Sequence, residues 1–86
     1  MITKESLNNK KLWLGGVSEN TRRDLLTLLR KLEWGCADLV LRHDGIYFWK
    51  SDGCLAFSED YDYFCNKNWE EVYINSIINP IWCKEE

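Results

Sequence analysis

The chain has 86 residues, a formal net charge of −3 and an apolar fraction of 45%. A chain of this length has room for one domain and one modest core, because small domains bury only about 60 to 65% of the surface that the unfolded chain exposes. Its five Trp, four Tyr and three Phe exclude the depleted composition of a disordered chain. No apolar run approaches the roughly 18 residues of a membrane helix. The start MITKESLNNKK lacks the apolar stretch of a signal peptide, so we expect a soluble protein of the cytoplasm.

Charge is unevenly divided along the chain. Residues 1–43 carry eight Lys and Arg against five Asp and Glu, whereas residues 44–86 carry three against nine, so their net charges are +3 and −6. A basic partner would be attracted to the second half. Because basic residues are few and no recognition motif occurs, we expect no direct binding of nucleic acid.

The first predicted strand lies close to the N-terminus. Residues 1–10 are polar and are expected to be frayed. The segment KLWL at 11–14 alternates apolar residues between two sides, which predicts a short strand that Gly15 and Gly16 end.

The clearest element is SENTRRDLLTLLRKLEWG at 18–35, which predicts an amphipathic helix of about four turns. Ser18 is suited to be its N-cap, because a hydroxyl can accept from backbone amides of the first turn. Gly35 is placed to end it in the left-handed conformation. One apolar stripe follows from helical spacing: Leu25, Leu28, Leu29 and Leu32.

Two Asp-Gly pairs, Asp44-Gly45 and Asp52-Gly53, separate short apolar runs and predict two-residue hairpin turns in a three-stranded meander. This register places Phe48 opposite Phe57 and Lys50 opposite Leu55. Alternation then gathers one apolar face for the helix to cover: Leu39, Leu41, Ile46, Phe48, Leu55 and Phe57.

The opposite face of this meander is mixed and includes two large aromatics, Tyr47 and Trp49. One helix cannot cover both sides of a sheet. This face is therefore either covered by the C-terminal segment or meets a partner, which includes a second copy of the chain. The covering side chains would be Trp69, Tyr73, Ile77 and Trp82.

The rest of the chain completes an α+β domain. Residues 59–68 read as an irregular, acidic connection, EEVYI at 70–74 as a strand, and NSIINPIW at 75–82 as a closing turn or short helix that Pro80 ends. The expected order is β-α-β-β-β-β, with one amphipathic helix packed on a small, mostly antiparallel sheet in a single domain over residues 1–86.

The cysteines contain no CxxC or CxxH pair. Zinc sites usually draw their ligands from such close pairs, and disulfides are rare without secretion, so free thiols are favoured over a disulfide or a metal site. The residues concerned are Cys36, Cys54, Cys65 and Cys83. We expect no metal and no cofactor.

The segment SEDYDYF at 58–64 predicts a contact surface, because tyrosines give large rigid area while acids steer a basic partner. The alternative is a solvated loop with its rings tucked under. The predicted partner-binding residues are Tyr47, Trp49, Glu59, Asp60, Tyr61, Asp62 and Tyr63.

A second hypothesis is an anion site where the first strand passes through two glycines into the helix N-terminus. Neither GxGxxG nor GxxxxGK[ST] is present, so the motif is weak. The residues for an anionic ligand such as a nucleotide would be Gly15, Gly16, Ser18, Arg22 and Arg23.

The single histidine, His43, stands next to Asp44 and could form an acid–base pair with it. An Asp before Gly is also ordinary turn chemistry, because it tolerates positive φ. No activated nucleophile is placed near the pair, so we expect no catalytic residues and no enzyme.

One pattern within residues 12–78 consists of a helix ending in an aromatic and a glycine, a short meander and an acidic strand, carried by TRRDLLTLLRKLEWGC, GIYFW, CLAFS and NWEEVYINSII. In this pattern the chain resembles small accessory proteins encoded by bacteriophages. The resemblance implies a non-enzymatic protein of the host-cell cytoplasm that inhibits a host or defence protein, such as a CRISPR-Cas complex. It also allows a sponge for a nucleotide signal.

Overall fold

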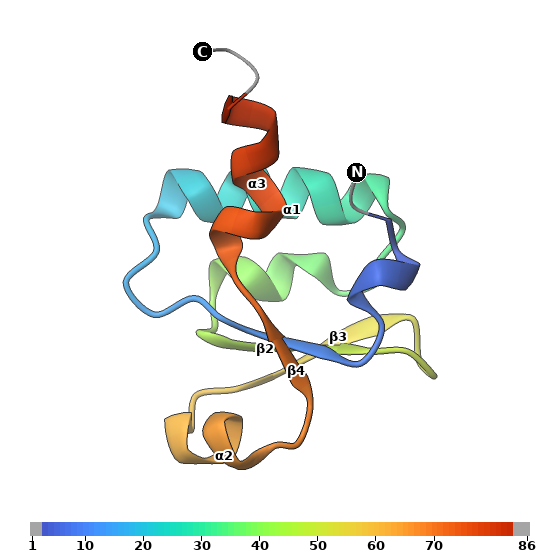
Figure 1. The fold of residues 1–86 in the computed structure, drawn as a ribbon, viewed down its shortest axis with the longest axis vertical. Coiled ribbons are helices and arrows are strands. Elements are labelled where there is room, and N and C mark those ends of the chain that lie inside the picture. Colours follow the sequence, from blue (N-terminus) through green and yellow to red (C-terminus); the bar gives the residue numbers. More distant parts are fainter. Residues whose placement is uncertain (1–2, 84–86) are drawn as a thin grey trace.

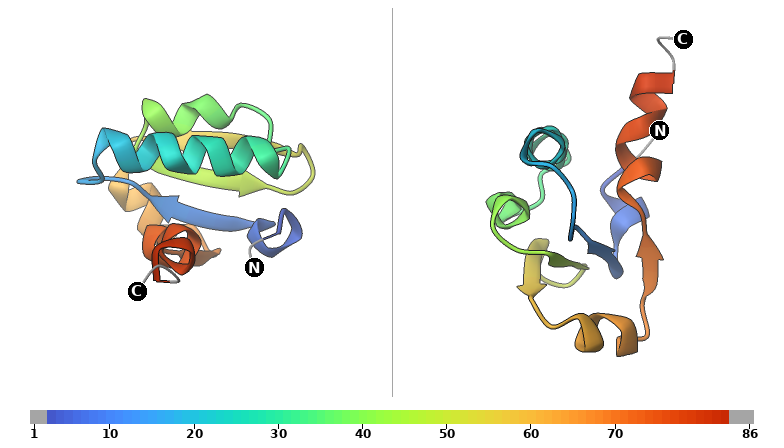
Figure 2. Two further views of the ribbon diagram at one scale, coloured as in Figure 1. Left: turned by 90° about the horizontal axis from the view of Figure 1, so that it is seen from above. Right: turned by 90° about the vertical axis from the view of Figure 1, so that its left-hand side faces the viewer.

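The computed structural model describes the backbone of residues 3–83 and the side chains of residues 3–78. A four-stranded sheet in the order β3-β2-β1-β4 lies at its centre. Helices α1 and α3 and the 3₁₀ helix η2 lie on one side of this sheet, and the short helix α2 lies on the other (Figures 1 and 2). The predicted α+β class is confirmed, with three α-helices among the described residues instead of one.

The strands are β1 (Lys10–Trp13), β2 (Gly45–Trp49), β3 (Cys54–Ser58) and β4 (Glu70–Val72). β1 is the strand predicted before Gly15, and it pairs antiparallel with β2 and parallel with β4. β2 pairs antiparallel with β3, so most of the pairing is antiparallel, as predicted.

The N-terminal residues form regular structure that the sequence does not predict. Glu5–Leu7 form a 3₁₀ helix, η1, and Leu7 is buried with 1% of its surface exposed. The expectation of a frayed segment over residues 1–10 is therefore wrong for residues 3–10, because one apolar side chain in a polar stretch suffices to anchor it to the core.

Helix α1 (Glu19–Lys31) begins as predicted, since the Ser18 hydroxyl accepts from the backbone amide of Thr21. Its predicted terminator is wrong. Glu33 and Cys36 take the left-handed conformation, whereas Gly35 has no positive φ and bridges to Cys54. A Cβ on Gly35 would lie 2.5 Å from the Cys54 Sγ, so an alanine here would have to displace the Cys54 thiol.

The predicted first strand of the meander does not form. Residues 37–41 form the 3₁₀ helix η2 (Ala37–Leu41), and Asp44-Gly45 is no hairpin turn because Gly45 already belongs to β2. The apolar alternation here serves packing between α1 and the sheet, where Ala37 and Val40 are buried. The predicted order β-α-β-β-β-β is therefore wrong in detail.

The second hairpin is present with a different loop. β2 and β3 are joined by the four residues 50–53, with Phe48 opposite Leu55 and Ile46 opposite Phe57. The predicted register is thus wrong by two residues. A shift of two keeps every side chain on its own face. Ile46, Phe48 and Leu55 are therefore buried on the predicted face, whereas Phe57 at its edge is 48% exposed.

The C-terminal part differs most from expectation. Residues 61–66 form α2 (Tyr61–Asn66), where an irregular connection was predicted, because the Asp60 carboxylate accepts from the Tyr63 amide as an N-cap. The predicted acidic strand is confirmed as β4. Helix α3 (Ile74–Cys83) continues past Pro80, so the proline does not end it.

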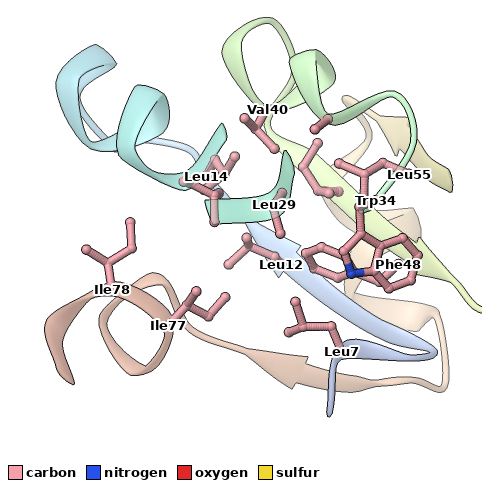
Figure 3. Close-up of a cluster of buried hydrophobic side chains, with 13 residues drawn as sticks. Leu7, Leu12, Leu14, Leu29, Trp34, Val40, Phe48, Leu55, Ile77 and Ile78 are labelled. Carbon is pink, nitrogen blue, oxygen red and sulfur yellow. The ribbon is translucent and has the colours of Figure 1, made fainter. Parts of the chain in front are cut away.

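The core lies between the sheet and the α1 side (Figure 3). The indole of Trp34 lies edge-on to the ring of Phe48 at 5.4 Å between centroids. Ile77 and Ile78 close this core from α3. The other fully buried members include Leu12, Leu14, Leu25, Leu29, Val40 and Ile46.

Candidate binding surface and the aromatic layer beneath it

A second, aromatic layer covers the sheet face opposite α1. Tyr47 lies at its centre, 2% exposed, with Phe64 of α2 and Trp69 around its ring. This face of the meander is therefore covered from within the chain, in part by the predicted Trp69. Tyr73 does not contribute, since it is 62% exposed, and Ile77 lies in the opposite core. The side chain of Trp82 is outside the described residues.

The predicted contact residue Tyr47 is therefore interior. Burial, with smaller contributions from Tyr63, Asp60 and Cys65, raises the pKa of its phenol to about 12. Its hydroxyl has no hydrogen-bond partner among the described residues. Trp49 is half-buried, with its ring 4.8 Å from that of Trp69.

A buried lysine ties α2 to this layer. Lys11 on β1 is 6% exposed, and its ammonium donates to the backbone carbonyls of Phe64 and Lys67. Such carbonyls at the end of a helix lack intrahelical partners and carry partial negative charge. The ammonium also lies 4.6 Å from the centroid of the Phe64 ring. Lys11 thus fixes the C-terminal end of α2 on the sheet.

The outer side of α2 carries the exposed aromatics that the sequence predicts. Tyr61 is 55% and Tyr63 47% exposed, while Phe64 between the helix and the sheet is 2% exposed. The neighbouring acids are exposed as well. We call this the α2 surface, defined by Glu59, Asp60, Tyr61, Asp62 and Tyr63. The alternative, in which a solvated loop buries both tyrosine rings beneath it, is wrong.

The rings on the α2 surface are held in place from below. The Tyr61 ring packs edge-on against Trp13 at 4.8 Å, and the Tyr63 ring packs edge-on against Tyr47 at 5.7 Å. The pKa of Tyr61 is raised through a hydrogen bond with the side chain of Cys65, one turn along the helix. Exposed aromatics with fixed orientation lose little conformational freedom on binding, which favours a contact role.

His43 pairs with a different carboxylate from the one beside it in sequence. Its Nδ1 lies 2.5 Å from the Glu59 carboxylate, and its ring stacks on Phe57 with centroids 3.6 Å apart. Asp44 instead accepts from Arg22. The predicted His43–Asp44 pair does not form. Both carboxylate oxygens of Glu59 have partners within the chain, because the second one accepts from the backbone amide of Asp44.

The residues of the proposed anion site are engaged elsewhere. Arg22 donates to four backbone carbonyls and to the Asp44 carboxylate, which uses the whole fork of its guanidinium. Arg23 pairs with Glu19 at 2.6 Å. The Ser18 hydroxyl caps α1, while Gly15 and Gly16 form the turn before it. These residues are neighbours, but their donors do not converge on a common point.

Three cysteines, Cys36, Cys54 and Cys65, are free thiols, and the side chain of Cys83 is outside the described residues. A hydrogen bond between Cys36 and Cys54 raises the pKa of Cys36. Within residues 3–78, no three His, Cys, Asp or Glu side chains lie close enough together to hold a metal ion.

Sequence reasoning missed the two lysines that organise the aromatic layer, Lys11 and Lys67. The ammonium of Lys67 faces four aromatic rings, described below. For Lys67 the sequence carries a signal, since YFCNKNW places aromatics on both sides of the lysine, whereas Lys11 in KKLWL has only Trp13 on one side.

Neither a protein-family model, nor a curated protein, nor a solved structure matches this chain at a significant level. Across the described helices, none combines the length and the apolar character that crossing a membrane requires.

Proposed function

We propose that this protein is a non-enzymatic binding module that engages a basic protein partner through the α2 surface. The observation that carries the proposal is the pair of half-exposed tyrosines, Tyr61 and Tyr63, held over a buried aromatic layer. Tyrosines supply large contact area and a hydroxyl at low entropic cost, and they are enriched where binding energy concentrates.

Charge supports a basic partner. Glu59, Asp60 and Asp62 are exposed beside the tyrosines, and Lys67 is the nearest cation in sequence. Carboxylates at the rim of an interface raise the rate of encounter with an oppositely charged surface and fix its orientation. We therefore expect association that weakens as salt is raised, because exposed charges are screened.

The class of partner rests on the resemblance to small phage accessory proteins. Under this proposal the protein works in the cytoplasm of an infected cell and inhibits a host or defence protein, of the kind that handles nucleic acid and is basic for that reason. A CRISPR-Cas complex is one candidate. A second copy of this chain is a further candidate for the partner.

Affinity capture from a bacterial lysate tests the proposal, with the tagged wild-type protein beside the double variant Tyr61→Ala, Tyr63→Ala. One basic protein enriched by the wild type and lost with the variant is the expected result. Size-exclusion chromatography of the purified protein separates capture of a partner from self-association.

Two control variants isolate the α2 surface. Tyr73→Ala removes another exposed aromatic, between β4 and α3, and Asp52→Asn removes an exposed acid in the β2–β3 loop. Both should capture the partner as the wild type does. Equal loss of binding in Tyr73→Ala and in the double tyrosine variant would show non-specific hydrophobic adhesion and would contradict the proposal.

A further inference from the structure

The ammonium of Lys67 sits in a cage of aromatic rings that belong to distant parts of the chain. Its Nζ lies 4.3 Å from the ring centroid of Trp69, 4.5 Å from Trp49, 5.6 Å from Tyr63 and 5.8 Å from Tyr47. A cation over the faces of Trp and Tyr within about 6 Å is attracted by the negative face of each ring.

The cage has a floor and an opening. Tyr47 is buried at its base, whereas Trp49 and Trp69 are half-buried and Tyr63 is 47% exposed. Lys67 itself is partly exposed. These rings form the Lys67 cage, which comprises Tyr47, Trp49, Tyr63 and Trp69.

The walls are fixed independently of the Lys67 side chain. Tyr47 and Trp49 are alternate residues of β2, and Tyr63 belongs to α2, whose end is held by the ammonium of Lys11. The rings also contact one another, with 4.8 Å between Trp49 and Trp69. Withdrawal of the lysine side chain would therefore leave the rings in place.

Lys67 is held there by few other interactions. Its ammonium lies 3.5 Å from the Tyr63 hydroxyl, and no described carboxylate lies within salt-bridge distance of it. A primary ammonium is compact and strongly hydrated, so it loses much of its hydration on entering such a cage. Aromatic cages of this kind recognise quaternary ammonium groups, whose methyl groups contact the rings directly.

We propose that the Lys67 cage is a binding site for a quaternary alkylammonium group, with the Lys67 side chain as a tethered competitor that leaves when the ligand enters. The group could come from a free quaternary ammonium compound such as choline or from a trimethylated lysine of a protein. The inference does not depend on the proposed function, since it concerns a small cation bound to the isolated chain.

The test is an NMR titration, in which each probe is added to the ¹⁵N-labelled protein at constant ionic strength. The indole N–H resonances of Trp49 and Trp69 report binding. The probes are choline, a trimethyllysine peptide and 3,3-dimethyl-1-butanol, the neutral isostere of choline. Sodium chloride serves as the salt reference. The tighter of the first two probes identifies the source of the group.

Removal of the competitor should raise affinity. The apparent Kd of a site that is open only part of the time is its intrinsic Kd divided by the fraction of time it is open. With Lys67 leaving the wild-type cage open about a tenth of the time, Lys67→Ala should bind choline about tenfold more tightly than the wild type. Lys50→Ala, which removes an exposed lysine next to Trp49 in sequence, should bind as the wild type does. Trp69→Ala should abolish the indole shift of Trp49.

Three results would overturn the proposal. The first is no saturable shift in Lys67→Ala while its amide spectrum shows a folded protein. The second is equal affinity for choline and for its neutral isostere, which would mean that the site binds the shape of the ligand and does not recognise its charge. The third is equal affinity in the wild type and Lys67→Ala, which would show that Lys67 does not compete.

Discussion

The ammonium of Lys11 donates to the backbone carbonyl of Lys67 at 3.0 Å, across 56 residues of sequence. Together with the bond to the Phe64 carbonyl, this contact joins β1 to the end of α2 and so positions both the α2 surface and the Lys67 cage. A buried charge is tolerated here because helix-terminal carbonyls satisfy it.

Lys11→Met should lower the free energy of unfolding by about 3 kcal/mol, because two buried carbonyls lose bonds to a charged donor. Lys10→Met is the matched control. Lys10 pairs with Glu70, whose side chain is 75% exposed, and such surface pairs contribute about 0 to 1 kcal/mol. Urea denaturation of both variants measures the difference, and equal effects would show that the Lys11 bonds contribute no more than a surface pair.

Arg22 should be a structural residue and no part of an anion site. Arg22→Lys keeps the charge but loses the planar fork that serves Val17, Val40 and Asp44, so we expect a loss of about 2 kcal/mol in stability. Arg23→Lys next to it should change stability by less than about 0.5 kcal/mol, since its pair with Glu19 is exposed. Added nucleotides should leave the Tm of the wild type unchanged in a thermal-shift assay. A rise in Tm with a nucleotide that is lost in Arg23→Lys would favour the anion site.

Tyr47 should make the protein sensitive to alkali. Its pKa is about 12 in the folded state and about 10 in an unfolded chain, so the unfolded state loses the phenolic proton first. The stability that Tyr47 contributes is therefore complete below pH 10 and is lost as pH rises from 10 to 12.

Tyr47→Phe should remove this alkaline dependence. It should also raise stability at neutral pH by about 1 kcal/mol, because a buried hydroxyl with no partner among the described residues is eliminated. Denaturation curves at neutral pH and near pH 11 check both effects. An unchanged alkaline dependence would mean that other groups titrate in this range.

Two glycines should differ in their tolerance of alanine. A Cβ at Gly45 would clash with the backbone carbonyl of Ser58 across the β2–β3 pairing, so Gly45→Ala should cost more than about 2 kcal/mol. Gly16 has φ +84° and open space around it, so Gly16→Ala should cost only about 1 kcal/mol of backbone strain. Thermal denaturation ranks the two, and a larger loss at Gly16 would contradict the register described for β2 and β3.

Local signals in the sequence were sufficient for α1, for β1 and for the faces of the β2–β3 hairpin. Ser18 and the leucine stripe act within one helix, and the alternation from Ile46 to Phe57 survives an error of two residues in register. Local signals were insufficient for η2, since the Arg22 guanidinium donates to the backbone carbonyls of Val40 and His43, 18 and 21 residues away. Sequence alternation cannot distinguish a strand from a buried 3₁₀ turn that a distant guanidinium holds.

The candidate site, like the fold, was predictable only where local sequence determines exposure. Tyr61 and Tyr63 are exposed among acids, as their local composition indicates. The prediction for Tyr47 is wrong because its burial depends on α2, a short helix that the acidic composition of residues 59–62 does not indicate and that the N-cap Asp60 begins. The Lys67 cage depends on the register of β2, on α2 and on Trp69 at once, and no local pattern specifies that combination.

The most direct test of the α2 surface is the change in amide chemical shifts of the ¹⁵N-labelled protein as the captured partner is added. The account predicts that the largest changes fall on residues 59–66, and that raising the salt concentration weakens the association. Largest changes at residues 15–23, around the turn and the N-terminus of α1, with residues 59–66 unaffected, would contradict it.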